Sequence, residues 1–212
     1  MPGRGLFITL EGGEGAGKTT LATSLAEAFR SEAHEVVLTR EPGGTPNAEA
    51  LRALLVEGEA DRWSPMAETL LMFAARADHV DRLIQPALDR GAVVICDRFT
   101  DSTRAYQGAA GGVSSFSIEA IREASLGGFE PDLTLIVDLD PALGIARTRT
   151  RGEAETRFER QPGAFHQALR AAFLEIAERA PERCVVLDGS SPAEDVAAKA
   201  RRVIAERLGV LA

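Results

Sequence analysis

Short apolar runs alternate along this chain with longer segments in which apolar residues recur every three or four positions. The short runs predict five strands, at residues 5–10, 36–39, 93–97, 133–138 and 184–187. The longer segments predict helices at residues 20–30, 48–56, 65–90, 118–126, 141–151 and 163–179 and from residue 192 onward. Pro86 predicts a bend in the 65–90 helix. Strands that alternate with helices predict an α/β fold, in which a five-stranded parallel sheet is covered by helices on both faces.

The predicted domain organisation is a single domain over residues 1–212. The length suits one hydrophobic core, and the sequence contains neither an internal repeat nor a low-complexity linker. Ligands of such sheets bind beyond the carboxyl ends of the strands. Polar segments at residues 12–19, 40–44 and 97–98 follow the first three predicted strands. We therefore expect these three segments to form one composite site.

The segment at residues 12–19, Gly-Gly-Glu-Gly-Ala-Gly-Lys-Thr, matches G-x-x-x-x-G-K-[ST] at every fixed position. A predicted strand precedes it and a predicted helix follows it, which is the context of a phosphate-binding loop. Glycines allow backbone N–H groups to surround phosphate oxygens, and the helix N-terminus adds partial positive charge. Lys18 is expected to reach the β- and γ-phosphates, and Thr19 to offer its hydroxyl to Mg²⁺. The predicted ATP-binding residues are Gly12, Gly13, Glu14, Gly15, Ala16, Gly17, Lys18, Thr19 and Thr20.

Asp97 and Arg98 follow the third predicted strand, where charged side chains favour a phosphate site. A carboxylate at Asp97 can hold Mg²⁺ directly or through water, opposite Thr19. The alternative for Asp97 is a simple cap at the end of the strand. The planar guanidinium of Arg98 can clamp a phosphate, or else pair with a neighbouring carboxylate.

Two further segments are candidates for an acceptor pocket. Residues 40–45, Arg-Glu-Pro-Gly-Gly-Thr, form a turn whose glycines permit close backbone approach, although a plain loop is the alternative. Met72, Phe73 and Arg76 share one face of the 65–90 helix. That face could hold a nucleotide base beside an arginine, or it could simply belong to the core.

Arginines alternate with glutamates at residues 147–160. Such a run is commonly a solvated helix face. The alternative is a lid that closes arginines over the transferring phosphoryl group and excludes water.

Composition narrows the choice of partners. A net charge of −8 argues against a broad nucleic-acid surface. Cys96 and Cys184 lie in predicted strands, which favours buried free thiols in a reducing compartment, and the three histidines lack metal-ligand spacing. Residues 1–4 lead directly into the first predicted strand, and no apolar run approaches the ~20 residues of a membrane span. We therefore expect a cytoplasmic protein with no membrane partner.

Four blocks together resemble bacterial thymidylate kinases: residues 11–20, 39–45, 74–80 and 97–108. The P-loop is common to many proteins, whereas Arg-Glu-Pro-Gly-Gly followed by Asp-Arg-Phe and Ala-Tyr-Gln-Gly is much more specific. The resemblance implies a P-loop NTPase fold and transfer of the ATP γ-phosphoryl group to dTMP, with Mg²⁺. It also implies a homodimer and an arginine-rich lid at about residues 147–160.

The same resemblance implies roles for individual residues. Glu14 would lie near the sugar 3′-hydroxyl, Arg98 would hold the acceptor phosphate, and Tyr106 would pack where a 2′-hydroxyl would sit. Arg76 and Thr103 would read the thymine edge. The implied substrate-binding residues are Glu14, Arg40, Glu41, Pro42, Met72, Phe73, Arg76, Arg98, Thr103, Tyr106 and Gln107. The implied catalytic residues are Lys18, Asp97, Arg98, Arg149, Arg151 and Arg157.

One position departs from the family pattern. The family usually carries phenylalanine four residues before the base-reading arginine, where this chain has Met72 followed by Phe73. Either side chain is therefore left to contact thymine. A kinase for another monophosphate remains an alternative for this reason.

Two other classes of P-loop protein are less compatible with the sequence. GTP-binding switch proteins recognise guanine through Asn-Lys-x-Asp, but the only asparagine here, Asn47, is followed by alanine. An ATPase that moves nucleic acid is disfavoured by the negative net charge.

Overall fold

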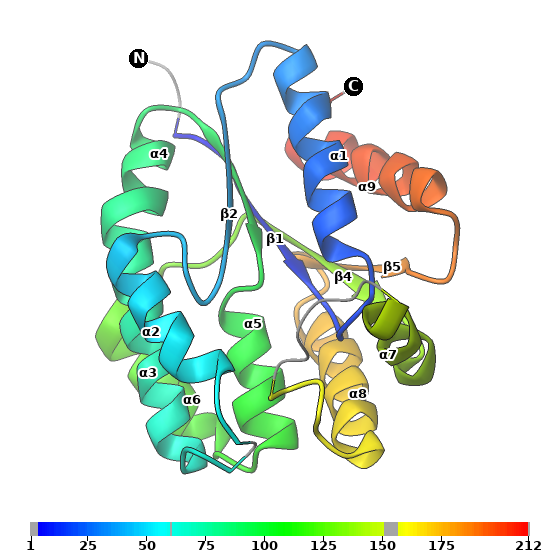
Figure 1. The fold of residues 1–212 in the computed structure, drawn as a ribbon. Coiled ribbons are helices and arrows are strands. Elements are labelled where there is room, and N and C mark those ends of the chain that lie inside the picture. Colours follow the sequence, from blue (N-terminus) through cyan, green and yellow to red (C-terminus); the bar gives the residue numbers. More distant parts are fainter. Residues whose placement is uncertain (1–3, 60, 151–156, 212) are drawn as a thin grey trace.

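The computed structural model describes residues 4–59, 61–150 and 157–211, and its described strands form one parallel sheet in the order β2-β3-β1-β4-β5 (Figure 1). The strands are β1 (Phe7–Glu11), β2 (Val36–Arg40), β3 (Val93–Asp97), β4 (Leu133–Asp138) and β5 (Cys184–Asp188). Strands β1, β3 and β4 are buried along most of their length, while β2 and β5 form the half-exposed edges. All five predicted strands are confirmed, and their first residues lie within two positions of the predicted ones.

The helices follow the predicted alternation with the strands. They are α1 (Lys18–Ser31), α2 (Pro46–Val56), α3 (Pro65–His79), α4 (Gln85–Asp89), α5 (Thr100–Thr103), α6 (Ser115–Leu126), α7 (Pro141–Thr150), α8 (Gly163–Arg179) and α9 (Ala193–Leu208). Two π-helical segments, η1 (Val80–Ile84) and η2 (Arg104–Ala110), extend α3 and α5. Among the described residues, no helix is both long enough and apolar enough to cross a membrane.

Helices cover both faces of the sheet, as the alternation predicts. On one face, α1 and α9 pack together over strand residues that include Leu10 and Ile95 (Figure 1). On the other face, η1 and α4 pack over Phe7 and Val94, while η2 and α8 pack over Ile136. Because successive residues of a strand point to opposite faces, each central strand contributes to both cores. The three-layer α/β/α arrangement is thereby confirmed.

The predicted helix at residues 65–90 is divided in the structure into α3, η1 and α4. The turn η1 joins α3 to α4, so the helical path continues through a π-helical turn. Proline has no backbone N–H to donate, and one wider turn accommodates that missing hydrogen bond.

The segment from α5 to η2 was not predicted to be helical. Its sequence begins Thr-Asp-Ser-Thr-Arg and has no apolar periodicity. Polar contacts hold it instead: Asp101 pairs with Arg104 and Arg183, and the Ser102 hydroxyl donates to Glu11 Oε2 at 2.6 Å. A pattern of hydrophobic positions cannot reveal a helix that is anchored by buried ion pairs.

The strand register places the polar segments side by side. Leu10 pairs with Asp97 between β1 and β3, and Arg40 pairs with Asp97 between β2 and β3. The carboxyl ends of these three strands therefore meet at one edge of the sheet, where the site lies.

Candidate active site

The loop between β1 and α1, which carries the P-loop motif, turns through three glycines with positive φ. Gly12, Gly15 and Gly17 have φ values of 132°, 66° and 101°, in the region that favours glycine. A Cβ on Gly15 would lie 2.0 Å from the carbonyl oxygen of Gly144, so this position also has no room for a side chain. Lys18 is buried, and its Nζ donates to the carbonyls of Gly12 at 3.1 Å and Gly13 at 2.8 Å. Burial lowers the pKa of Lys18 from its ordinary value.

A cleft of about 860 Å³ opens beside this loop and contains most of the predicted phosphate-site residues. The predicted residues that line it are Glu14, Gly15, Ala16, Gly17, Lys18, Thr19, Arg40, Glu41, Asp97, Arg98 and Arg149. Three predicted ATP-binding residues lie elsewhere. Gly12 and Gly13 line a smaller cavity behind the loop, and Thr20 is exposed on α1 without lining the cleft.

Thr19 and Asp97 lie next to each other in the lining of the cleft. The Thr19 hydroxyl donates to Asp97 Oδ2 at 3.1 Å. The other carboxylate oxygen, Oδ1, is buried and has no hydrogen-bond partner among the described residues. A buried carboxylate oxygen without a donor, next to a hydroxyl, suits a hard divalent cation, and these two residues therefore fit Mg²⁺.

Arg98 lies between this cleft and a second pocket, and its side chain lines both. Its Nη2 donates to Glu14 Oε1 at 2.9 Å, and its Nη1 donates to the Gly12 carbonyl at 3.0 Å. The backbone of Arg98 has a φ of 73°, which is uncommon for a residue with a side chain. Such strained positions cluster at functional sites, where the surrounding structure holds them in place.

Glu14 and Tyr106 connect the P-loop to the second pocket. The Tyr106 hydroxyl donates to Glu14 Oε1 at 2.6 Å, and the Arg98 guanidinium lies over the Tyr106 ring at 4.9 Å. Burial alone would raise the pKa of Glu14, but Arg98 and Lys18 outweigh burial and lower that pKa to about 2. Glu14 is therefore an ionised hydrogen-bond acceptor throughout the physiological pH range.

The second pocket, of about 110 Å³, contains most of the residues that the resemblance assigns to dTMP. The predicted residues that line it are Glu14, Glu41, Pro42, Met72, Arg76, Arg98, Thr103, Tyr106 and Gln107. Arg40 lines only the P-loop cleft and pairs at the surface with Glu49. Met72 lines the pocket, whereas Phe73 is buried beneath Arg76, whose Cζ lies 4.9 Å from the Phe73 ring centroid.

The predicted catalytic arginines of the 147–160 segment do not all line the P-loop cleft. Arg149 is exposed on α7 and lines the P-loop cleft. Arg157 is buried, forms an ion pair with Glu68, and donates from Nε to the carbonyl of Leu55. The structure therefore does not bring Arg157 to the P-loop cleft, because α3 offers it a carboxylate and α2 a backbone carbonyl. Arg151 lies outside the described residues.

Several site residues were missed by sequence reasoning. Arg52, on α2, lines both the cleft and the second pocket, and its Nη1 donates to the Pro42 carbonyl at 2.8 Å. Ser102 and Phe158 also line the second pocket. One signal could have indicated Arg52: it is the only cationic residue between Arg40 and Arg62.

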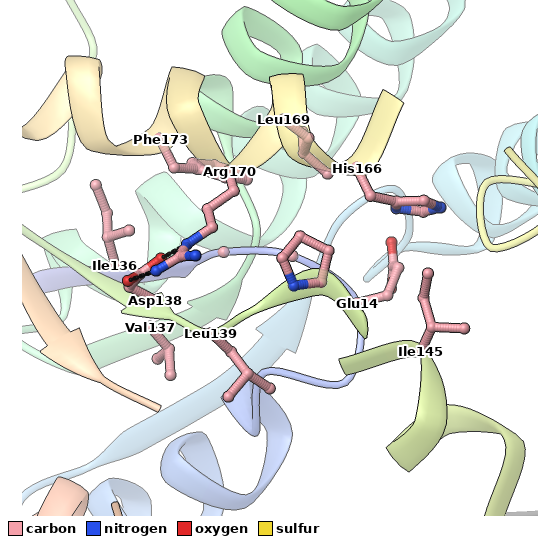
Figure 2. A pocket seen from close by; sticks show the side chains of 13 residues that line it. Glu14, Ile136, Val137, Asp138, Leu139, Ile145, His166, Leu169, Arg170 and Phe173 are labelled. Carbon is pink, nitrogen blue, oxygen red and sulfur yellow. Dashed lines mark hydrogen bonds and ion pairs between the residues drawn. The ribbon is translucent and has the colours of Figure 1, made fainter. Parts of the chain in front are cut away.

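A small cavity of about 20 Å³ lies behind the P-loop, between β4 and α8 (Figure 2). Arg170 of α8 forms two hydrogen bonds to Asp138 at the end of β4, at 2.7 and 2.8 Å. His166 and Glu14 lie near the same end of the cavity, and His166 Nε2 is buried without a partner among the described residues. The cavity has room for a water molecule but not for a nucleotide.

Comparison with known proteins gives a consistent result. A family model described as thymidylate kinase matches residues 10–200. Thymidylate kinase of Caulobacter vibrioides is 55% identical over 207 residues, which cover 98% of this chain and 99% of that protein. Thymidylate kinase of Ruegeria pomeroyi is 47% identical over 208 residues, which cover 98% of each chain. The crystal structure of thymidylate kinase from Ehrlichia chaffeensis matches with a TM-score of 0.78 and 34% identity, covering 96% of this chain and 100% of that one.

The match to the family model spans most of the chain, and the relatives align along nearly its whole length with a common fold. On these grounds, the chain belongs to the thymidylate kinase family.

Proposed function

We propose that this chain transfers the γ-phosphoryl group of ATP to dTMP, giving dTDP and ADP. Membership of the thymidylate kinase family supports this activity. The observation that carries it is the junction of the P-loop cleft and the second pocket at Arg98, which lines both. A phosphoryl donor in the cleft and a monophosphate in the second pocket would meet at this guanidinium.

The chemistry requires positioning and charge more than covalent participation. The attacking oxygen belongs to a phosphate that is already ionised, so no residue needs to remove a proton from it. Lys18 would neutralise the β- and γ-phosphates, and Arg98 would hold the acceptor phosphate against them. Arg52, which also lines both cavities, would add a second guanidinium on the acceptor side.

Thr19 and Asp97 would hold Mg²⁺, since they offer a hydroxyl and a buried carboxylate oxygen at the cleft. When bound, the ion supplies positive charge to the β- and γ-phosphate oxygens. Asp97 would hold the ion in a fixed position relative to the sheet, because β3 pairs with a strand on each side.

The second pocket would hold the nucleoside of dTMP. Arg76 lines it and carries a buried Nη1 that has no partner among the described residues, which suits a thymine carbonyl. Thr103, Gln107 and Met72 also line this pocket. The first two would offer polar groups to the base, and Met72 would supply the apolar contact that the resemblance assigns to phenylalanine. Tyr106 would exclude a ribose 2′-hydroxyl, leaving Glu14 for the 3′-hydroxyl.

Residues 147–160 would act as the lid. Arg149 lines the P-loop cleft, which supports a role on the transferring phosphoryl group. Arg157 would instead anchor the end of this segment to α2 and α3 through Leu55 and Glu68. Arg151 remains a proposed lid arginine by resemblance.

The activity is tested by ADP release with Mg-ATP and equal concentrations of dTMP, dUMP, dCMP, dGMP and AMP. We expect strong preference for dTMP, with dUMP slower, because dUMP lacks the methyl group that Met72 would contact. A loss of one buried methyl contact lowers kcat/KM by about tenfold. Preference for another monophosphate, or equal ADP release without any acceptor, would contradict the proposed substrate.

We also propose that the protein works in the cytoplasm without a stable nucleic-acid or membrane partner. The reducing conditions of that compartment would keep its buried cysteines, Cys96 and Cys184, as thiols.

The active form is proposed to be a homodimer that pairs through α3. Leu70 and Met66 on α3 have 51% and 41% of their surface exposed, and Phe116 on the neighbouring α6 has 83% exposed. Large apolar side chains gathered on adjacent helices favour contact with a second copy.

Leu70→Glu should convert the dimer to a monomer at micromolar concentration, because a carboxylate would be buried at the interface. Size-exclusion chromatography with light scattering measures this. Leu143→Glu is the matched control, since Leu143 on α7 is 53% exposed and lies on a different helix. A wild-type monomer, or equal effects of the two substitutions, would contradict the α3 interface.

A further inference from the structure

We infer that His79 is a positioning residue for dTMP, because it fixes Glu41 and, through Glu41, the base-reading guanidinium of Arg76. The inference rests on the proposed role of Arg76 in the acceptor pocket. His79 lies at the C-terminal end of α3, is completely buried, and lines neither the P-loop cleft nor the acceptor pocket. It would act on the substrate only through its neighbours.

A chain of hydrogen bonds connects these residues. Glu41 Oε2 accepts from Arg76 Nε at 2.6 Å, and Glu41 Oε1 lies 3.0 Å from His79 Nδ1. The opposite ring nitrogen, Nε2, lies 2.8 Å from Thr39 Oγ1. The chain therefore links the end of β2, which carries Thr39, and the turn that follows it, which carries Glu41, to helix α3, which carries Arg76 and His79.

The acceptor-only carboxylate decides the direction of these bonds. Because Glu41 forms an ion pair with Arg76, its oxygens accept, and Nδ1 of His79 must be the donor. In the neutral ring, Nε2 then accepts from the Thr39 hydroxyl. The imidazole is held at both nitrogens, and the carboxylate is held at both oxygens, so neither group can rotate without losing a buried hydrogen bond.

Arg76 is held in one orientation by the same arrangement. Its Nε donates to Glu41, its Nη2 donates to the Phe99 carbonyl at 3.0 Å, and its Cζ lies 4.9 and 5.2 Å from the ring centroids of Phe73 and Phe99. Only Nη1 is left buried without a partner among the described residues. Buried donors are nearly always paired, so this N–H group is kept for an acceptor on the ligand.

A metal site is the competing interpretation of the same cluster. One ligand atom each from Glu41, His79 and Cys96 lies within 4.8 Å of the others. However, both oxygens of Glu41 already face donors, and one of these donors is the positively charged Arg76. Burial also raises the pKa of the Cys96 thiol well above its ordinary value, which disfavours the thiolate that a metal needs. The cluster is therefore a hydrogen-bond network of Thr39, His79, Glu41 and Arg76, which we call the relay.

The test measures initial rates of ADP release with dTMP and ATP varied separately. His79→Leu should raise the KM for dTMP about tenfold, as expected for loss of a buried hydrogen bond to a charged group, while kcat and the KM for ATP change less than about twofold. Thr39→Val removes only the hydroxyl, and it should raise the KM for dTMP about threefold. His34→Leu is the matched control, because His34 lies in the loop before β2 and lines neither cavity.

His79→Gln separates positioning from simple packing. Its amide N–H can donate to Glu41 and its amide oxygen can accept from Thr39, so the KM for dTMP should return to within about threefold of the wild-type value. In wild-type protein, ¹⁵N NMR should find His79 with its proton on Nδ1. An unchanged KM for dTMP in His79→Leu, or a glutamine variant no better than the leucine variant, would overturn the relay.

Arg76→Ala distinguishes failure of the relay from failure of the proposed function. It should raise the KM for dTMP more than His79→Leu does. If Arg76→Ala leaves that KM unchanged, the acceptor pocket itself is wrongly assigned. If Arg76→Ala raises the KM and His79→Leu does not, the pocket stands and the role of His79 is wrong.

Discussion

Replacing Arg98 with alanine should lower kcat by about a thousandfold while the Kd for ATP changes less than about threefold. Arg98 is expected to contact the acceptor phosphate and to neutralise charge as the phosphoryl group transfers, whereas the P-loop backbone and Lys18 are expected to hold ATP. Its guanidinium already lies at the junction of the two cavities, between the Gly12 carbonyl and the Glu14 carboxylate. Turnover is measured by ADP release, and ATP affinity is measured separately by calorimetry.

Alanine is the informative substitution because of the backbone at this position. Arg98 has a positive φ, and alanine keeps the Cβ that makes this conformation costly, so the backbone strain is retained. Glycine would relieve that strain, so its effect would combine the loss of the guanidinium with a change in backbone strain. The alanine variant therefore reports on the guanidinium alone.

Two controls separate charge from geometry. Arg98→Lys keeps the positive charge but loses the planar fork, so we expect it to recover only a small part of the lost kcat. Arg90→Ala removes an exposed arginine that pairs with Glu35 at the surface, and it should retain activity within about twofold. A fall in ATP affinity as large as the fall in kcat would show that Arg98 serves the donor nucleotide instead.

The layers of this fold were readable from the sequence because its central strands are buried on both faces. Five short apolar runs and the helices between them gave the strand positions, and the sheet contains all five. The P-loop could also be predicted from the sequence, because its glycines, Lys18 and Thr19 lie within one short segment. The chemistry of phosphate binding explains each of these residue types. In a contiguous motif of this kind, the local sequence alone predicts the conformation of the loop.

Other parts of the site depend on contacts between distant segments. Phe73 and Met72 occupy adjacent positions on one helical face, and spacing could not decide which of them meets the ligand. In the fold, the guanidinium of Arg76 lies between the rings of Phe73 and Phe99, which follows β3, while Met72 lines the second pocket. The position of Arg157 could not be predicted either, because its buried partner, Glu68, is on a helix far away in sequence.

The role proposed for His79 could not be predicted from the spacing of the histidines in the sequence. Their sequence spacing excluded a conventional metal site and gave His79 no role. In the fold, the turn after β2 brings Glu41 beneath His79 and Arg76, so three polar side chains from two segments satisfy one another in the core. Such relays depend on tertiary packing and leave no periodic signal in the sequence.

Replacing Lys18 with methionine should lower kcat/KM for ATP by about a thousandfold or more, because no other lysine lies in the cleft. The ammonium of Lys18 is buried at the P-loop, within reach of the carbonyls of Gly12 and Gly13. In that position it would meet the phosphate charge where water cannot screen it. Methionine keeps a similar length and apolar stem, so the core around α1 should remain packed.

The chain supplies its own control for this experiment, since it contains only two lysines, Lys18 and Lys199. Lys199 is exposed on α9 and lines neither cavity, so Lys199→Met should retain full activity. Both variants should melt within about 4 °C of the wild type, because methionine preserves packing at each site and 1 kcal/mol shifts Tm by about that much in a chain of this size. A loss below about tenfold in Lys18→Met, with Tm preserved, would mean that the backbone N–H groups and the arginines carry the phosphate charge without it.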